Sequence, residues 1–250
     1  MQDIYLDDLG KGVPLVLVHG FLGSSKMWEP QINFFKKYYR VITLDIPGFG
    51  KSNKAKSFDD IGSIAQLLLD CIEEKKINKF HLLGHSMGGM IAQEMVRIAS
   101  SKILKIIFYS TGPIGEMPGR FETVSKSRKN LKQNGLNVTA RNIAKTWFVK
   151  GDKAKYFDIC IKSGRETSFE AADNALIAFE KWNGIDALKN IKNETLIVWG
   201  EKDKSYNLEQ ITTLKNNIKN SKLKIFKDCA HNIHLEEVDY FNRTINSFLL

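Results

Sequence analysis

Short, continuous apolar runs recur along the chain, each about as long as one strand. They occupy residues 14–18, 40–44, 80–83, 103–109, 194–200 and 223–226. A strand that is covered on both faces needs such a run, whereas a half-exposed strand alternates apolar and polar positions. We therefore predict buried parallel strands at these positions, with residues 2–6 forming an additional edge strand.

Helical periodicity fills several of the intervals between these runs. Apolar residues recur at helical spacing in 58–74, and residues 27–37 and 236–250 are also predicted to be helical. A regular alternation of strands and helices is typical of a mostly parallel sheet with helices on both faces. The fold class predicted from the pattern is therefore α/β.

Residues 113–188 interrupt this alternation with helical patterns that are rich in aromatic residues. The aromatic positions are Phe121, Trp147, Phe148, Tyr156, Phe157, Phe169, Phe179 and Trp182. The segment is moderately basic, with thirteen Lys and Arg against nine Asp and Glu. We predict that it is a helical insertion between two core segments, 1–112 and 189–250, because 250 residues suit one large α/β domain.

The formal net charge of +9 comes from lysines that are scattered along the chain, without a run of five or six basic residues. This distribution favours a solvated basic surface over a nucleic-acid interface. It is compatible with the steering of anionic substrates or of an acidic partner.

Cys71, Cys160 and Cys229 are widely spaced and form no CxxC pair. Neither a disulfide framework nor a zinc site is indicated, and we expect no metal or cofactor. The N-terminus lacks the features of a signal peptide, and no apolar run approaches the roughly 18 residues that a membrane helix requires. We therefore expect a cytoplasmic protein without a membrane partner.

A Gly-x-Ser-x-Gly sequence, Gly84-His85-Ser86-Met87-Gly88, lies between the strand at 80–83 and a helical pattern. Small neighbours allow a tight bend that lifts the serine hydroxyl clear of the sheet. The N–H of Met87 then lies at the start of a helix, where it can stabilise an oxyanion. A loop-to-helix junction with a capping serine is the alternative interpretation of the same sequence.

This stretch resembles the nucleophile elbow of the α/β-hydrolase family, and other segments extend the resemblance over nearly the whole chain. His19-Gly20-Phe21 is similar to the family loop whose backbone supplies a second oxyanion donor, which would be the N–H of Phe21. The loop that begins at Asp45 is similar to a structural turn of the family. The resemblance implies that 113–188 is a cap over the nucleophile.

A buried strand that ends in Gly-x-x-Asp resembles the family loop that presents the acid of a catalytic triad. Asp203 is the matching residue. Glu201 lies nearer to the strand end than the family acid does, and Asp228 is close in sequence to the candidate histidine. The resemblance therefore favours Asp203 over both alternatives.

The candidate histidine is His231, with Ala230 before it and Glu236 five residues after it, as in the family pattern. His234 falls outside that pattern and is predicted to be a pocket or surface residue. The order Ser86, Asp203, His231 is the order that this fold requires.

Four residues are predicted to contact substrate, and most other aromatic residues of the insertion are expected to be packing residues, with about one in three reaching the substrate. The four are Leu22, Trp147, Trp182 and His234.

The resemblance implies a serine hydrolase that cleaves a small-molecule carboxylic ester through an acyl-enzyme. Enol-lactonase, thioesterase and carbon–carbon bond hydrolase activities use the same triad and remain alternatives. Related haloalkane dehalogenases and epoxide hydrolases use aspartate in place of Ser86, which argues against their chemistry. The alternative outside the enzymes is a small-molecule receptor that retains the hydrolase fold.

Overall fold

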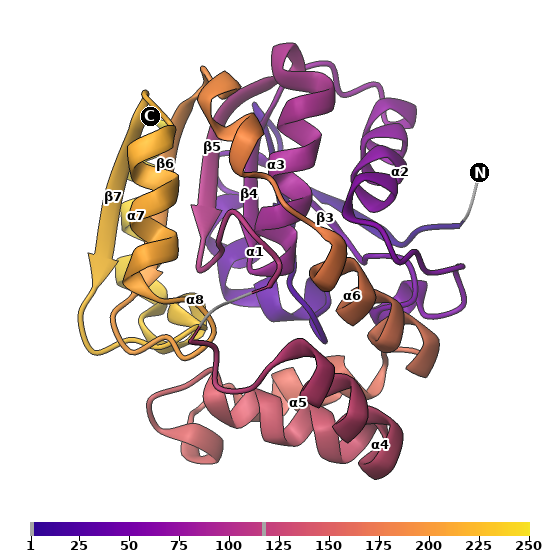
Figure 1. The fold of residues 1–250 in the computed structure, drawn as a ribbon. Coiled ribbons are helices and arrows are strands. Elements are labelled where there is room, and N and C mark those ends of the chain that lie inside the picture. Colours follow the sequence, from indigo (N-terminus) through magenta and orange to yellow (C-terminus); the bar gives the residue numbers. More distant parts are fainter. Residues whose placement is uncertain (1–2, 117–118) are drawn as a thin grey trace.

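The computed structural model of the chain describes residues 3–116 and 119–250. The described residues form one seven-stranded sheet with the strand order β1-β3-β2-β4-β5-β6-β7 (Figure 1). Only β1 is antiparallel to its neighbour; the other neighbouring strands are parallel. The strands are β1 (Leu6–Leu9), β2 (Pro14–Val18), β3 (Arg40–Leu44), β4 (Phe80–His85), β5 (Ile103–Tyr109), β6 (Glu194–Gly200) and β7 (Ser221–Phe226).

Helices follow most of the strands, and short 3-10 turns complete the connections. The α-helices are α1 (Glu29–Phe35), α2 (Ile61–Glu74), α3 (Met87–Ala99), α4 (Val124–Thr146), α5 (Phe157–Arg165), α6 (Phe169–Lys181), α7 (Leu208–Asn217), α8 (Ile233–Glu236) and α9 (Val238–Leu249). The 3-10 turns are η1 (Ser25–Trp28), η2 (Gly50–Ser52), η3 (Ser100–Lys102), η4 (Gly151–Lys153) and η5 (Ile185–Asn190).

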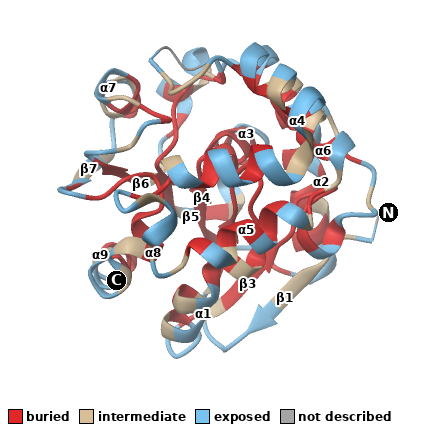
Figure 2. Cartoon of the chain, turned by 90° about the horizontal axis from the view of Figure 1, so that it is seen from below, coloured by how far each residue is buried: buried red, intermediate tan, exposed pale blue. Residues whose placement is uncertain are grey.

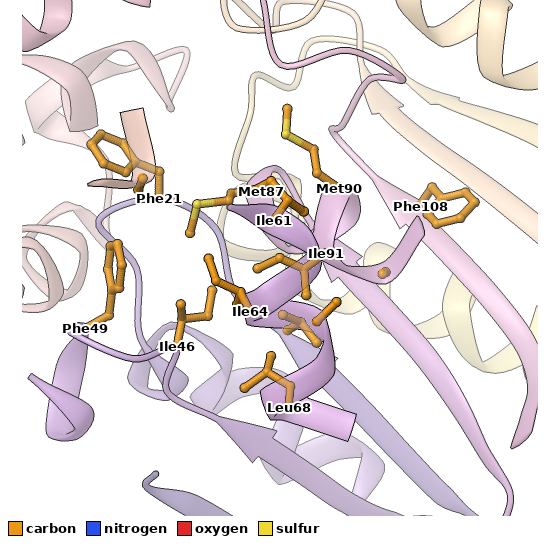
Figure 3. Packing of buried hydrophobic residues seen from close by; sticks show 14 of the residues in the cluster. Phe21, Ile46, Phe49, Ile61, Ile64, Leu68, Met87, Met90, Ile91 and Phe108 are labelled. Carbon is orange, nitrogen blue, oxygen red and sulfur yellow. The ribbon is translucent and has the colours of Figure 1, made fainter. Parts of the chain in front are cut away.

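Alternate residues of the central strands supply two separate apolar cores. On one face, Val16 and Leu82 belong to a cluster with the buried sides of α2, α3 and α7. On the other face, Leu17 and Leu83 pack with residues of α1 and α9. Figure 3 shows how Met87 and Ile91 of α3 lie among side chains of α2. The prediction of a sheet covered on both faces is therefore confirmed.

Helices α4, α5 and α6 are inserted between β5 and β6, and they lie beyond the carboxyl ends of the strands (Figure 1). Their inner sides are buried and their outer sides are exposed (Figure 2). One apolar cluster is continuous from the sheet into this insertion. The helical insertion is thus present, while the division at 113 and 188 stays a prediction.

The structure moves several of the predicted boundaries. The edge strand lies at Leu6–Leu9 instead of residues 2–6, because the register with β3 pairs Leu6 with Leu44; residues 1–2 lie outside the described residues. The predicted helix 27–37 is a 3-10 turn followed by α1. The predicted helix 236–250 is α9, which begins at Val238, and Glu236 ends a separate short helix, α8.

Candidate active site

Ser86 occupies a sharp turn between β4, the central strand, and α3. Its backbone adopts φ 56° and ψ −119°, a region that costs a non-glycine residue of the order of 1–3 kcal/mol. Glycine is required on both sides, because a Cβ at Gly84 would lie 2.2 Å from the Gly88 carbonyl oxygen, and one at Gly88 would lie 2.3 Å from that of Val18. The turn therefore holds the serine at the carboxyl edge of the sheet.

Two backbone N–H groups beside Ser86 are available to a ligand. Within the described residues, the amides of Phe21 and Met87 have no hydrogen-bond acceptor. The loop of Phe21 is fixed by His19, whose Nε2 accepts a hydrogen bond from Ile46 N at 3.0 Å and whose Nδ1 donates to Gly20 O at 2.8 Å. Burial lowers the pKa of His19, which keeps this ring in the neutral form that the two bonds require.

His231 and Asp203 form a buried pair. The Nδ1–H of His231 donates to Oδ2 of Asp203 at 2.9 Å, and the two side chains are 3% and 0% exposed. The other carboxylate oxygen of Asp203 accepts from the backbone N–H of Ser205 at 2.7 Å. Because Nδ1 carries the hydrogen, the lone pair of His231 is on Nε2. Glu201, the competing acid, is exposed and lies 3.3 Å from Lys202.

Neighbouring rings and the backbone fix the position of His231. The ring of Tyr206 stacks on it with a centroid distance of 5.8 Å and an interplanar angle of 14°, and Trp147 of the insertion lies 6.2 Å away. The carbonyl oxygen of His231 accepts from Tyr109 Oη at 3.0 Å, and His85 Nε2 lies 3.2 Å from it. The described residues include no hydrogen bond between Ser86 Oγ and the His231 ring.

Tyr206 interacts both with His231 and with Ser86. It is buried, and burial raises the pKa of its phenol, while Ser86 is the main group that opposes this rise by hydrogen bonding. Thr111 has a smaller effect of the same sign. The phenol of Tyr206 therefore lies within reach of the serine hydroxyl in this structure.

A small cavity joins Ser86 to His231. The volume of the cavity that is open to the centres of water molecules is about 20 Å³, which is enough for one or two waters. It is lined by Phe21, Ser86, Arg120, Phe121, Ile143, Trp147, Phe179, Ser205, Tyr206 and His231. Three of the eight aromatic residues noted in the insertion therefore reach this cavity.

Of the four predicted substrate contacts, Trp147 lines the cavity and the other three do not. Leu22 is fully buried beside Gly164 of α5. Trp182 is directed to the core, where its Nε1–H donates to Glu94 at 3.0 Å. His234 is fully buried, with Nδ1 2.9 Å from Tyr109 Oη, so that the expectation of a pocket or surface residue was wrong.

Three polar residues of the cavity were not predicted from the sequence. Ser205 and Tyr206 lie two and three residues after Asp203, and this proximity to the acid is a signal that could have identified them. Arg120 stands in the connection before α4, outside any motif. Asp45, which was expected to be structural, accepts hydrogen bonds from the backbone N–H groups of Ser25 and Lys51.

The fold and this site together define the class of protein. A family model described as the alpha/beta hydrolase fold matches residues 13–238, and the chain belongs to this family as a hydrolase of the alpha/beta fold. The family expectation from the sequence is thereby confirmed.

Individual relatives resemble the chain over nearly its whole length. It is 29% identical to a pimeloyl-(acyl-carrier protein) methyl ester esterase from Legionella pneumophila, over 99% of this chain and 100% of that protein. It is 25% identical to an (E)-2-((N-methylformamido)methylene)succinate hydrolase from Acinetobacter baylyi, over 96% and 91%. A solved esterase from Exiguobacterium antarcticum has a TM-score of 0.91 at 27% identity, over 98% of this chain and 94% of that chain.

Proposed function

We propose that the protein is a serine hydrolase that cleaves a small-molecule carboxylic ester, with Ser86 as nucleophile, His231 as base and Asp203 as the acid that orients it. The observation that carries this proposal is the buried Asp203–His231 hydrogen bond, whose histidine shares one cavity with the strained Ser86. Relatives named as esterases support the cleavage of an ester.

The reaction proceeds in two halves. Ser86 Oγ attacks the ester carbonyl while His231 Nε2 takes the serine proton, and Asp203 stabilises the imidazolium that forms. The tetrahedral intermediate then collapses, and the imidazolium protonates the departing alcohol. Water attacks the acyl-enzyme with His231 again acting as base, which releases the carboxylic acid and restores Ser86.

The oxyanion of both tetrahedral intermediates is assigned to the N–H groups of Phe21 and Met87. Their lack of acceptors within the described residues supports this role. In comparable sites one such donor contributes about 3 kcal/mol to transition-state stabilisation. For nucleophilic attack, Ser86 Oγ has to form a hydrogen bond with His231 Nε2 when the ester is bound.

Replacement of the nucleophile tests the proposal. Ser86→Ala is expected to reduce hydrolysis of p-nitrophenyl butyrate by about 10⁴-fold or more, because removal of a triad member abolishes covalent catalysis. A fluorophosphonate should label the parent protein at Ser86 and leave the variant unlabelled, as intact-mass measurement would show. Ser205→Ala, a second serine of the cavity, is the matched control and should retain labelling.

The same experiment separates the enzyme from the receptor alternative. Labelling of another residue, or an unchanged rate in Ser86→Ala, would exclude Ser86 as the nucleophile. Tight binding of a small molecule by the parent protein, without labelling or turnover, would favour a receptor.

A further inference from the structure

Arg120 is a cation in the wall of the cavity that contains Ser86 and His231. It precedes α4 and lines the cavity together with Ser205 and Tyr206. The remaining wall is largely apolar. A guanidinium remains charged at any pH at which the protein is folded, so the cavity contains a permanent positive charge.

The guanidinium of Arg120 has no ion-pair partner. Its Nη1 donates to Glu122 O and to Ser127 Oγ, both at 2.9 Å, and its carbon atom Cζ lies 4.3 Å from the centroid of the Phe121 ring. No carboxylate of the described residues lies within 4.0 Å of it. Glu122 is the carboxylate that acts electrostatically on Arg120, but its two oxygens accept hydrogen bonds from Ser127 Oγ and Asn130 Nδ2.

Two other arginines of the insertion, Arg128 and Arg141, have carboxylate partners, whereas Arg120 has none among the described residues. Arg128 donates to Asp173 at 2.8 Å and 3.2 Å, and Arg141 lies 3.4 Å from Asp152. Arg120 is more desolvated than these, and burial lowers its pKa. Arg120 is partly buried, and a partly desolvated cation without a counter-ion is unfavourable, so its surroundings suit an anion that arrives with a ligand.

One edge of the Arg120 guanidinium remains available to a ligand. Nε and Nη2 make no hydrogen bond within the described residues, and these two parallel N–H donors match the two oxygens of a carboxylate. Tyr206 acts electrostatically on Arg120 and also reaches Ser86. Arg120, Tyr206 and Ser86 line the same cavity.

We propose that Arg120 binds a carboxylate on the substrate, so that the preferred substrates are esters with a free carboxylate in the same molecule. This inference rests on the proposed function, because it names the substrate class of the Ser86 site. Ser205 and Tyr206 supply further hydroxyl donors at the same wall, and the apolar side chains Ile143 and Phe179 contact the carbon chain between the carboxylate and the ester.

Matched esters test the proposal. Mono-p-nitrophenyl adipate is compared with p-nitrophenyl hexanoate for a carboxylate on the acyl side. The butyryl ester of 3-hydroxybenzoate is compared with phenyl butyrate for a carboxylate on the alcohol side. We expect kcat/KM to favour the anionic member of at least one pair by about 10- to 100-fold, as one charge-assisted hydrogen-bonded pair provides.

Variants assign that preference to Arg120. Arg120→Gln should lose the preference, measured as the ratio of kcat/KM on the anionic ester to kcat/KM on the neutral ester, and a circular dichroism spectrum that matches the parent protein shows that it folds. Arg120→Lys keeps the positive charge but lacks the two parallel N–H donors, and its preference for the anionic ester should lie between those of the parent protein and Arg120→Gln. Arg141→Gln removes a paired arginine of the same insertion outside the cavity and should leave every rate unchanged. Equal rates on both members of each pair, or an equal loss on both in Arg120→Gln, would overturn the proposal.

A binding measurement separates this proposal from the proposed function. In isothermal titration calorimetry, adipate should bind to the parent protein and to Ser86→Ala but not to Arg120→Gln. If neither ester class is hydrolysed but this binding occurs, the proposed function fails and the carboxylate site remains. If esters are hydrolysed and adipate does not bind, the carboxylate site fails.

Discussion

Gly20 packs directly against the nucleophile. A Cβ at this position would lie 2.8 Å from Ser86 Cβ and 3.4 Å from Ser86 Oγ. Gly20→Ala is therefore expected to displace the serine or the Phe21 amide and to lower kcat by about 100-fold, as small misplacements of reacting groups do. The measurement is the rate on a neutral p-nitrophenyl ester.

Gly62→Ala is the control, since a Cβ there meets the Asp60 carboxylate at 3.2 Å, on the exposed end of α2. It should retain full activity. A Gly20→Ala protein with the parent rate would show that the loop tolerates the added methyl group.

The sequence could predict individual residues only where a motif surrounds them. Ser86, Asp203 and His231 each follow a strand of the parallel sheet, and the structure brings Asp203 and His231 to 2.9 Å. Arg120 could not be predicted, because its position depends on how the insertion packs. Trp182 was predicted to contact substrate, and it does not line the cavity for the same reason: its side chain points to Glu94, a hydrogen-bond partner that is distant in sequence.

Helix α8 connects the loop of His231 to the insertion through one carboxylate. Oε1 of Glu236 accepts from Val149 N at 2.7 Å, and Oε2 accepts from Ala230 N at 2.6 Å. Glu236→Gln would leave an amide NH₂ facing one of these N–H groups. We expect the free energy of unfolding to fall by about 1–3 kcal/mol, the cost of one unsatisfied donor, in urea titrations.

Glu237→Gln is the matched control, because that side chain is exposed. It should unfold within about 0.5 kcal/mol of the parent protein. Equal stability of the parent and Glu236→Gln would contradict the assigned bonds.

The helices and strands that agree best with the prediction are those in which a single hydrophobic pattern continues from one end to the other. The buried strands agree closely, since both faces of each are covered and the apolar run is continuous. The short helix α8 was not predicted, and it is separated from α9 by Glu237, whose backbone is not helical (φ −124°, ψ 57°). A local backbone change of this kind leaves no periodic signal.

All five histidines of the molecule are buried, and this makes its stability sensitive to acid. Burial lowers the pKa of His81 to about 4 and that of His234 to about 3, and it lowers the pKa of His85 well below 6.5. The unfolded chain therefore binds more protons than the folded protein below pH 6.5. The free energy of unfolding should fall as the pH decreases from 6.5 towards 4, by up to about 1.4 kcal/mol per pH unit for each histidine.

Urea unfolding at pH 7.5, 6.0 and 5.0 measures this slope. His81→Gln removes one of the protons taken up on unfolding, at a position beside Tyr39 and away from the cavity, and should make the slope shallower. A stability that is constant between pH 7.5 and 5.0 would contradict the neutral state of the buried histidines.

At the scale of the whole molecule, the alternation of strands and helices was sufficient for the fold class and for the existence of an insertion. Strand order and the packing of α4, α5 and α6 arise from contacts between distant segments, which no local pattern reports. In the described part of the chain, no helix has both the length and the apolar character to cross a bilayer.

The cavity beside Ser86 has room for little more than a water molecule. Because an ester is larger than this space, we expect the insertion to move away from the carboxyl edge of the sheet when an ester enters, so that binding selects the fraction of molecules that are open at that moment. The apparent dissociation constant then equals the intrinsic constant divided by this fraction. A variant that loosened the insertion would therefore bind its substrate more tightly without gaining a single contact to it, and affinity in this protein depends on the population of open molecules as much as on the cavity wall.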